Sequence, residues 1–224
     1  IHHYLYNGVG QPLGHICKGN IQWNESEIIY DVGGRLLKGS REGEGFEYEY
    51  DDLSQVIKEG EVKEYRYDLR LNRVKKGKSI FLYNALNQIL NVSGKKITYD
   101  LNGNMIKRKG IACCYDAMNR LTSVKTPAGC QDYCYDAFNR RISSNKGINK
   151  YLYMGQNEIG LLVDDDYQQL RILGIGKGAE IGAAIAFELE GKVYYPVHDL
   201  QGNVSLLVDE DTSEIIERYK YTVF

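Results

Sequence analysis

The sequence has almost no net charge, no long apolar run and few prolines. Lys and Arg number 28 against 30 Asp and Glu, so the basic footprint of a nucleic-acid-binding protein is missing. The longest apolar run, in IGAAIAFEL, is far shorter than the roughly 20 residues of a membrane-spanning helix. The opening IHHYLYNG carries neither an initiator Met nor a signal-peptide pattern. We therefore expect an excised piece without a targeting signal, and neither nucleic acid nor membrane insertion.

Cysteine is scarce and odd in number. The five residues are Cys17, the adjacent Cys113 and Cys114, and then Cys130 and Cys134. An odd count argues against a closed disulfide framework. The CC and CxxxC spacings depart from the usual CxxC of zinc sites, and no His lies nearby in the sequence. We therefore expect no metal and reduced thiols that are buried or half-buried in strands.

Glycine and tyrosine, by contrast, are abundant. The chain has 24 Gly with only 3 Pro, and 19 Tyr against 5 Phe. Glycine supplies tight turns, and aromatic residues favour strands. Because the chain is also long enough to bury a sizeable core, this bias predicts an all-β protein.

A short motif recurs along the chain, and it begins with an aromatic residue followed by Asp or Asn. YDLNGNM and YDAMNRL are two neighbouring copies that begin 16 residues apart. Tandem copies follow one another, and HDLQGNV is a further copy after a long gap. Such an array predicts a repeat architecture in which these residues have a structural role. The signature residues are Tyr30, Asp31, Gly34, Tyr50, Asp51, Tyr67, Asp68, Tyr83, Asn84, Asn87, Tyr99, Asp100, Gly103, Tyr115, Asp116, Asn119, Tyr135, Asp136, Asn139, His198, Asp199 and Gly202.

The composition of the motif predicts a chain reversal, which we call the corner. The Asp or Asn after the aromatic residue can accept backbone amide hydrogen bonds at the first position of a type I turn. Four positions after the aromatic residue the sequence has mostly Gly or Asn, which tolerate the left-handed conformation. Together they predict a three-residue hairpin loop with a G1 bulge. In the Tyr67 copy Leu71 takes this position and Asn72 follows, so we expect one inserted residue there.

Two further features make each unit a pair of short antiparallel strands. An aliphatic residue after each corner is expected to begin the return strand: Leu36, Val56, Val74, Ile89, Met105, Leu121, Ile142 and Val204. A second turn is expected in the tandem units at Gly43 and Gly45, Gly60, Gly77, Gly94, Gly110, Gly129 and Gly147.

The strands that lead into the corners alternate strictly. In EYEYD, Tyr48 and Tyr50 share one face of the strand, while Glu47 and Glu49 share the other. We expect the rings of neighbouring units to stack across the sheet, where such pairs contribute roughly 0.2–1 kcal/mol each. The hydroxyl of tyrosine also suits a partly dry face, because it can reach water or a backbone group.

The run of YDxxGRL and YDxxNRL units resembles the YD repeats of bacterial Rhs proteins, of the shell-forming subunits of Tc toxin complexes and of the teneurin YD shell. The tail from LGIGKG to YKYTVF resembles the start of the Rhs-associated core segment. The resemblance divides the chain into YD-repeat hairpins over residues 1–157, clear from about residue 30, and a core-like β segment over 158–224 of the same sheet. It implies a continuous curved or spiralling sheet that forms part of a hollow shell.

In that family the shell holds a C-terminal toxin domain, so the resemblance implies a structural segment of a polymorphic toxin. The expected partners are the rest of the parent polypeptide, its toxin cargo and a secretion or translocation machine, with export or injection from a bacterium. Exposed edge strands should also favour self-association. The alternative function is a cell-surface adhesion module whose exposed tyrosines bind carbohydrate or protein.

Catalysis is not expected in this chain. Many relatives cleave themselves with aspartates in a motif downstream of the core segment, and the matching positions do not occur in the sequence. No cofactor is expected either. GIGKGAEIG, residues 174–182, departs from a phosphate-binding loop because Lys177 is followed by Gly178 rather than Ser or Thr. It predicts a glycine-rich connection before a hairpin of AAIAFEL and EGKVYYPV.

Two polar groups have structural interpretations that we favour. The Asp run 164–166 lacks the regular oxygen ligands and closing Glu of a calcium loop, so a solvated turn is expected. His198 and Asp199 are adjacent on a strand and so point to opposite faces, which argues against a catalytic pair. His198 is instead expected to replace the tyrosine of a corner.

Overall fold

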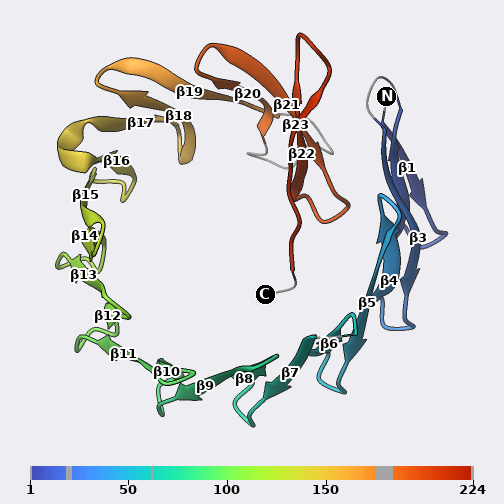
Figure 1. The fold of residues 1–224 in the computed structure, drawn as a ribbon, viewed down its shortest axis with the longest axis horizontal. Helices are drawn as coiled ribbons and strands as arrows, with labels where there is room; N and C mark the ends of the chain where they lie inside the picture. The colour runs from blue at the N-terminus through green and yellow to red at the C-terminus, as the bar shows by residue number, and fades with distance from the viewer. Residues whose placement is uncertain (1, 19–21, 62, 175–183, 223–224) are drawn as a thin grey trace. The chain divides into compact units, whose positions relative to one another are not determined.

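A computed structural model describes residues 2–18, 22–61, 63–174 and 184–222 as a succession of antiparallel strands (Figure 1). The all-β class and the tandem hairpins are therefore confirmed. Within the described residues, the strands form one 23-stranded sheet, and the one helical element is a short 3-10 turn, Asn145–Gly147. The chain divides into a central unit, Arg66–Arg171, and a terminal unit made of Ile1–Tyr65 and Ile172–Phe224.

The central unit is a series of hairpins in which strands that follow one another in the sequence pair. For example, β13 pairs with β14, and β14 pairs with β15, in both cases antiparallel. The strands are β8 (Arg73–Lys76), β9 (Ser79–Tyr83), β10 (Ile89–Val92), β11 (Lys95–Tyr99), β12 (Met105–Arg108), β13 (Ile111–Tyr115), β14 (Leu121–Thr126), β15 (Gly129–Tyr135), β16 (Arg141–Ser144), β17 (Asn149–Met154), β18 (Asn157–Val163) and most of β19 (Asp166–Leu173).

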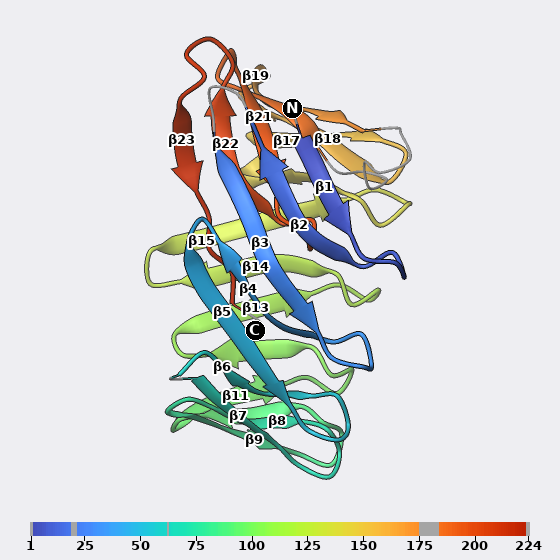
Figure 2. The same cartoon turned by 90° about the vertical axis from the view of Figure 1, so that its right-hand side faces the viewer.

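The terminal unit brings together the beginning and the end of the described chain (Figure 2). Its strands are β1 (His2–Tyr6), β2 (Pro12–Cys17), β3 (Trp23–Tyr30), β4 (Leu36–Arg41), β5 (Glu44–Tyr50), β6 (Val56–Glu59), most of β7 (Lys63–Tyr67), β20 (Ala184–Leu189), β21 (Lys192–His198), β22 (Val204–Asp209) and β23 (Ile215–Arg218). The hairpin predicted from AAIAFEL and EGKVYYPV is confirmed as β20 and β21.

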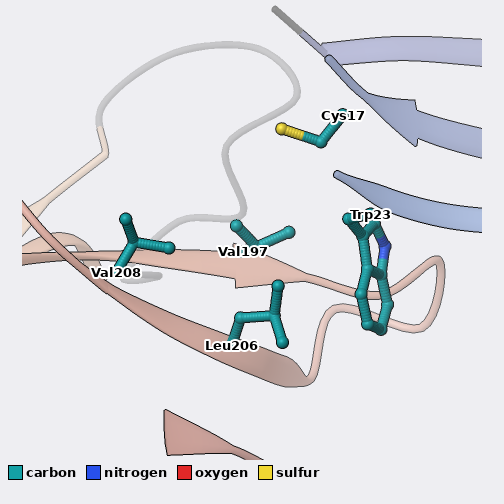
Figure 3. Packing of buried hydrophobic residues seen from close by; sticks show 5 residues of the cluster. All are labelled: Cys17, Trp23, Val197, Leu206 and Val208. Carbon is teal, nitrogen blue, oxygen red and sulfur yellow. The ribbon is translucent and has the colours of Figure 1, made fainter. Parts of the chain in front are cut away.

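The core of the terminal unit lies where these two parts meet. Cys17 and Trp23, from β2 and β3, are buried with Val197 of β21 and Leu206 and Val208 of β22 (Figure 3). Leu206 has no exposed surface, and Trp23 is only 2% exposed. Burial of such apolar side chains stabilises a fold by about 1.5–3 kcal/mol each, so this cluster holds the first and last hairpins together.

The alternation predicted for the strands that lead into the corners is observed. In β5, Tyr48 and Tyr50 are half-buried, whereas Glu47 and Glu49 are exposed. In β7, Tyr65 is buried. These two strands therefore present an aromatic face and a charged face, as a period of two requires.

Candidate functional site

The corner at Tyr30 shows how the motif reverses the chain. The Asp31 carboxylate Oδ1 accepts hydrogen bonds from the amides of Gly33 and Arg35, each at 2.9 Å. The Gly34 amide donates to the Asp31 carbonyl at 3.0 Å, and the Asp31 amide donates to the Arg35 carbonyl at 2.9 Å. Gly34 has a φ of +81°, in the left-handed region. The acid thus closes a turn that needs one left-handed residue, as in a G1 bulge.

The same geometry recurs at every copy that the sequence predicts. Oδ1 of the residue after the aromatic one accepts amides from the residues two and four positions further on at Asp51, Asp68, Asn84, Asp100, Asp116, Asp136 and Asp199. The fourth position after the aromatic residue has a positive φ at Ser54, Asn87, Gly103, Asn119, Asn139 and Gly202.

The prediction of one inserted residue in the Tyr67 loop is wrong. Leu71 itself is left-handed, with a φ of 64°, and its amide donates to the Asp68 carbonyl at 3.0 Å. The loop therefore has the same length as the others. A branched side chain in this conformation is costly, so the closed hydrogen-bond pattern of the corner holds Leu71 there.

Two return strands begin one residue earlier than predicted, with arginine in place of an aliphatic residue. β8 begins at Arg73 rather than Val74, and β16 begins at Arg141 rather than Ile142. The Arg73 guanidinium lies 5.4 Å from the ring centre of Phe81, and Arg141 lies over two tyrosine rings. The arginine stem covers apolar surface and the guanidinium faces a ring, so arginine can occupy this position.

The corner tyrosines connect each unit to the preceding one. The Tyr99 hydroxyl donates to the Ile89 carbonyl at 3.0 Å, and the Tyr115 hydroxyl donates to the Met105 carbonyl at 3.1 Å. In each case the acceptor is the first residue of the return strand in the preceding unit. The other donors of this kind are Tyr30, Tyr50, Tyr83, Tyr135, Tyr153 and Tyr221.

A phenol is protonated at neutral pH, and partial burial favours that state further at four of the corner tyrosines. Burial raises the pKa of Tyr50, Tyr83, Tyr115 and Tyr135 above the ordinary value of a phenol. A neutral hydroxyl is required for donation to a carbonyl, so burial and the hydrogen bond favour the same state. The result is a relay of hydrogen bonds that runs from unit to unit.

The residue five positions after the aromatic one forms a second connection, which the sequence analysis missed. Arg120 donates from Nε to Asp116 Oδ2 at 2.7 Å, and from Nη1 to the Asp136 carbonyl at 3.1 Å. Asn104 donates to Asp100 Oδ2 at 2.9 Å and to Asn119 Oδ1 of the next corner at 2.8 Å. A polar residue recurs at this position, and that regularity was the available signal.

These contacts also keep the corner acids ionised. Hydrogen bonds from the fifth residue lower the pKa of Asp31, Asp68, Asp100 and Asp116 below the ordinary value of an aspartic acid. Each of these carboxylates accepts several donors within its own loop. The carboxylates are therefore used to hold the turn.

The ring stacking expected between neighbouring units is replaced by stacking of arginine on tyrosine. The Arg35 guanidinium lies 4.9 Å from the ring centre of Tyr50, and Arg120 lies 5.0 Å from that of Tyr135. Among the described residues, the pairs of rings in contact lie near the N-terminal end and at Phe46 and Tyr48, rather than between successive corner tyrosines. Cation–π contacts of this kind contribute about 0.5–1 kcal/mol when exposed.

A further corner lies in the segment that the sequence analysis left weakly assigned. In YNGVGQP, Asn7 Oδ1 accepts the amides of Val9 at 3.1 Å and Gln11 at 2.9 Å, and Gly10 has a φ of +82°. The Pro12 carbonyl then accepts the Tyr30 hydroxyl at 2.8 Å. An aromatic residue followed by Asn, with Gly four positions on from Tyr6, was a usable signal.

The His198 corner differs from the others because it is packed against strands β3 and β4. Glu25 Oε2 accepts the Leu200 amide at 2.7 Å, and the Arg41 guanidinium lies 2.9 Å from Glu25 Oε1 and 3.0 Å from Asp199 Oδ2. The side chains of Glu25 and Asp199 have no exposed surface. Burial raises the pKa of Glu25, and Arg41 opposes that rise.

His15 is a second buried polar group in this region. It has no exposed surface, stacks on Tyr4 with ring centres 4.3 Å apart, and its Nε2 lies 2.9 Å from Nδ1 of His2. Burial, together with the neighbouring His2, lowers the pKa of His15 to about 4. His15 is therefore neutral at physiological pH.

The expectation for the thiols is correct in part. All five cysteines are free, and Cys17 and Cys113 are buried. Cys114, Cys130 and Cys134 are exposed, contrary to the expectation of burial. Cys114 follows a buried residue on β13, so the alternation of the strand places it on the opposite face.

The remaining candidates have no ligand-binding geometry in the described part of the chain. Asp164 and Asp165, both with positive φ, form the turn between β18 and β19, as the solvated-turn interpretation predicts. GIGKGAEIG lies outside the described residues, apart from its first position. Among the residues that the structure describes, no group of three or more His, Cys, Asp or Glu side chains could hold a metal ion. The same residues contain no helix suited to crossing a membrane.

Comparison with known proteins identifies the family of the chain. A structure of the Photorhabdus luminescens Tc holotoxin pore aligns with 99% of this chain, at 13% identity and a TM-score of 0.43. A crystal structure of TcdB2–TccC3 also aligns with 99% of this chain, at 13% identity and a TM-score of 0.42. This chain spans only 16% and 17% of those chains. No curated protein matches. The teneurin YD-shell family matches residues 8–224, and this chain belongs to that family.

Proposed function

We propose that the chain is a stretch of shell wall within a longer polypeptide, and that this shell encloses a C-terminal toxin domain. The observation that carries the proposal is the relay from each corner tyrosine to the carbonyl of the preceding unit. A wall must resist opening between its units. Backbone pairing alone would attach neighbouring hairpins only through main-chain hydrogen bonds. The relay adds hydrogen bonds from tyrosine side chains to carbonyls of the preceding units.

The corner acids support a structural rather than a catalytic role. Asp100 Oδ1 accepts two amides of its own loop, and Oδ2 accepts the Asn104 side chain. A general base needs a free lone pair within reach of a substrate proton and a pKa near the operating pH. The Asp100 carboxylate has a lowered pKa and several donors, so we assign it no catalytic step.

The division of the chain is part of the proposal. Residues 1–157 are YD-repeat hairpins, and residues 158–224 begin a segment related to the Rhs core. The partners are the remainder of the parent polypeptide and its toxin cargo, and the whole is exported or injected by a bacterium. The two matched structures are of Tc toxin components and include TccC3.

The adhesion alternative has less support from the tyrosines. Tyr99 and Tyr115 are half-buried, and their hydroxyls already donate to carbonyls within the sheet. A glycan would need those rings and hydroxyls to be free. The repeat tyrosines therefore favour the wall over a binding surface.

The proposal is tested by native mass spectrometry of the parent polypeptide, expressed with everything that its reading frame encodes after Phe224. We expect a toxic C-terminal segment that stays in the complex, either uncut or cleaved and retained. A parent without a toxic segment, or a cleaved segment that leaves under native conditions, would overturn the proposal and favour the adhesion module.

A further inference from the structure

Most corners present an exposed apolar side chain at the tip of the turn. Leu101 is 106% exposed and Leu69 is 105% exposed, relative to a fully accessible residue. Turn tips are usually polar, and an apolar side chain at a tip offers surface that a docked partner can bury. The other exposed tips are Val9, Val32, Leu53, Leu86, Met118 and Phe138.

One corner shows what covers a tip. In the His198 corner, Leu200 is half-buried because the corner lies against strands β3 and β4. Glu25 accepts the tip amide of Leu200, and Arg41 contacts both Asp199 and the Gln201 side chain. A carboxylate and a guanidinium on neighbouring strands therefore form a socket for a corner. The carboxylate binds the tip amide and the guanidinium binds the corner acid.

The Tyr99 corner has the same chemistry as this docked corner. DLNGN, residues 100–104, matches DLQGN, residues 199–203, at every position except Asn102. In both, an Asn at the fifth position donates to the corner acid, at 2.9 Å from Asn104 and 3.0 Å from Asn203. In the corners where this position is Arg120 or Arg140, the arginine Nε already forms an ion pair with the corner acid, Asp116 or Asp136. Asp100, which accepts only neutral donors in its own corner, thus keeps the capacity to bind a cation.

A partly exposed pair of the same chemistry lies on strands β18 and β19, where the Gln169 amide oxygen also accepts from Nε and Nη2 of Arg171 at 2.9 and 3.2 Å. Glu158 and Arg171 form an ion pair of 3.3 Å across these adjacent strands, and their side chains are 26% and 35% exposed. In the filled socket the corresponding exposures are 0% for Glu25 and 22% for Arg41. The planar guanidinium of Arg171 can donate two parallel hydrogen bonds to a carboxylate. A lysine could not bind a carboxylate in this way.

We propose that the Asp100–Asn104 corner is a docking tip for another stretch of YD strand, and that for the isolated chain this stretch is β18–β19 of a second copy. The Glu158 carboxylate would accept the Leu101 amide, and Arg171 would bind Asp100. Leu101 loses its exposure in the contact. The inference deepens the proposed shell function, since it names the contact by which one length of wall meets another.

The test is the self-association of the chain, measured by sedimentation equilibrium. Asp100→Asn keeps the turn, because Asn84 performs the same role in its own corner, but removes the charge that Arg171 would bind. We expect Asp100→Asn and Arg171→Gln each to weaken association about tenfold or more. Asp116→Asn is the matched control, and we expect no change because Arg120 already holds Asp116.

A photo-crosslinking residue at position 101 gives a direct readout that does not depend on stability. We expect crosslinks from Leu101→p-benzoylphenylalanine to peptides of a second copy that contain Glu158 or Arg171. The same probe at Leu82, which is exposed on β9, should not reach them. Equal effects of Asp100→Asn and Asp116→Asn, crosslinks elsewhere, or a chain that stays monomeric would overturn the docking pair. None of these outcomes alters toxin retention by the parent polypeptide, which tests the shell separately.

Discussion

The corner divides its work among three kinds of residue. The acid after the aromatic residue closes the turn of its own unit through two backbone amides. The tyrosine hydroxyl reaches back to the preceding unit, and the residue five positions on from it reaches forward to the next. A single motif therefore determines both the local reversal and the attachment of one unit to its neighbours.

The left-handed position gives the most local test. Asn119 has a φ of 61°, where a β-branched side chain is strained. We expect Asn119→Val to lower the free energy of unfolding by about 1–2 kcal/mol. Ala117→Val, in the same corner but outside the left-handed region, should change it little. Equal losses in the two variants, measured by thermal denaturation, would contradict the turn assignment.

The tyrosine relay is tested by removing one hydroxyl. Tyr99→Phe leaves the ring but removes the donor to the Ile89 carbonyl. We expect the free energy of unfolding to fall by about 0.5–1.5 kcal/mol, the usual contribution of such a bond. Tyr167→Phe is the control, since Tyr167 is 63% exposed. If both variants unfold at the same urea concentration as the unsubstituted chain, the relay contributes no stability.

Pairs of strands meet across long sequence separations in the terminal unit. Glu25 of β3 accepts an amide from Leu200, and Arg218 at the end of β23 pairs with Glu42. The apolar cluster around Leu206 lies between the same elements. The Glu25 contact and the apolar cluster make a buried seam between the first and last hairpins, beside the more exposed Arg218–Glu42 pair. The strength of the seam depends on charges that are removed from water.

Breaking the buried charge network should be costly. Arg41→Gln leaves the carboxylates of Glu25 and Asp199 buried without their guanidinium. We expect a loss of about 3–5 kcal/mol in the free energy of unfolding. Arg218→Gln, which breaks a pair in which the arginine is 51% exposed, should lose only about 0–1 kcal/mol. The comparison uses urea denaturation, and equal losses would contradict a buried seam.

Acid should weaken the terminal unit through His15, whereas Glu25 acts with the opposite sign because burial raises its pKa. Folded His15 has a pKa of about 4, whereas its ordinary value is 6.5, so the unfolded chain binds the proton first as the pH falls. Stability from His15 is complete above pH 6.5, and about 3 kcal/mol of it is lost by pH 4. His2, whose pKa is also lowered, acts with the same sign.

Unfolding measured at pH 7 and pH 4 checks this dependence. We expect His15→Phe, which preserves stacking on Tyr4, to remove most of the slope between these values. If the free energy of unfolding of this variant still changes with pH as in the unsubstituted chain, groups other than His15 cause the acid sensitivity.

What the sequence could predict follows from the range of each interaction. The turn at Asp100 is local, because the acid and the amides that it binds lie within one loop, and its geometry was predictable. Leu71 was misread because its left-handed conformation has no cue in its residue type. Glu25 and Leu200, which form a hydrogen bond in the socket, are 175 positions apart in the sequence. No local pattern indicates that pairing.

At the scale of the whole molecule, the corners and the relay repeat from one unit to the next. Each unit adds two strands and one corner, and the contacts of the central unit are mainly between neighbours in the chain. Such quasi-one-dimensional structures gain stability from each interface in turn. A wall made in this way can be long without a large single core.

The most direct test of the wall is limited proteolysis of the parent polypeptide. The rate of cleavage of its C-terminal segment is compared with that of the same segment expressed alone. The account predicts that the segment within the parent survives protease concentrations that degrade the free segment. Equal rates of cleavage in the two forms would contradict enclosure by a shell of which this chain is part.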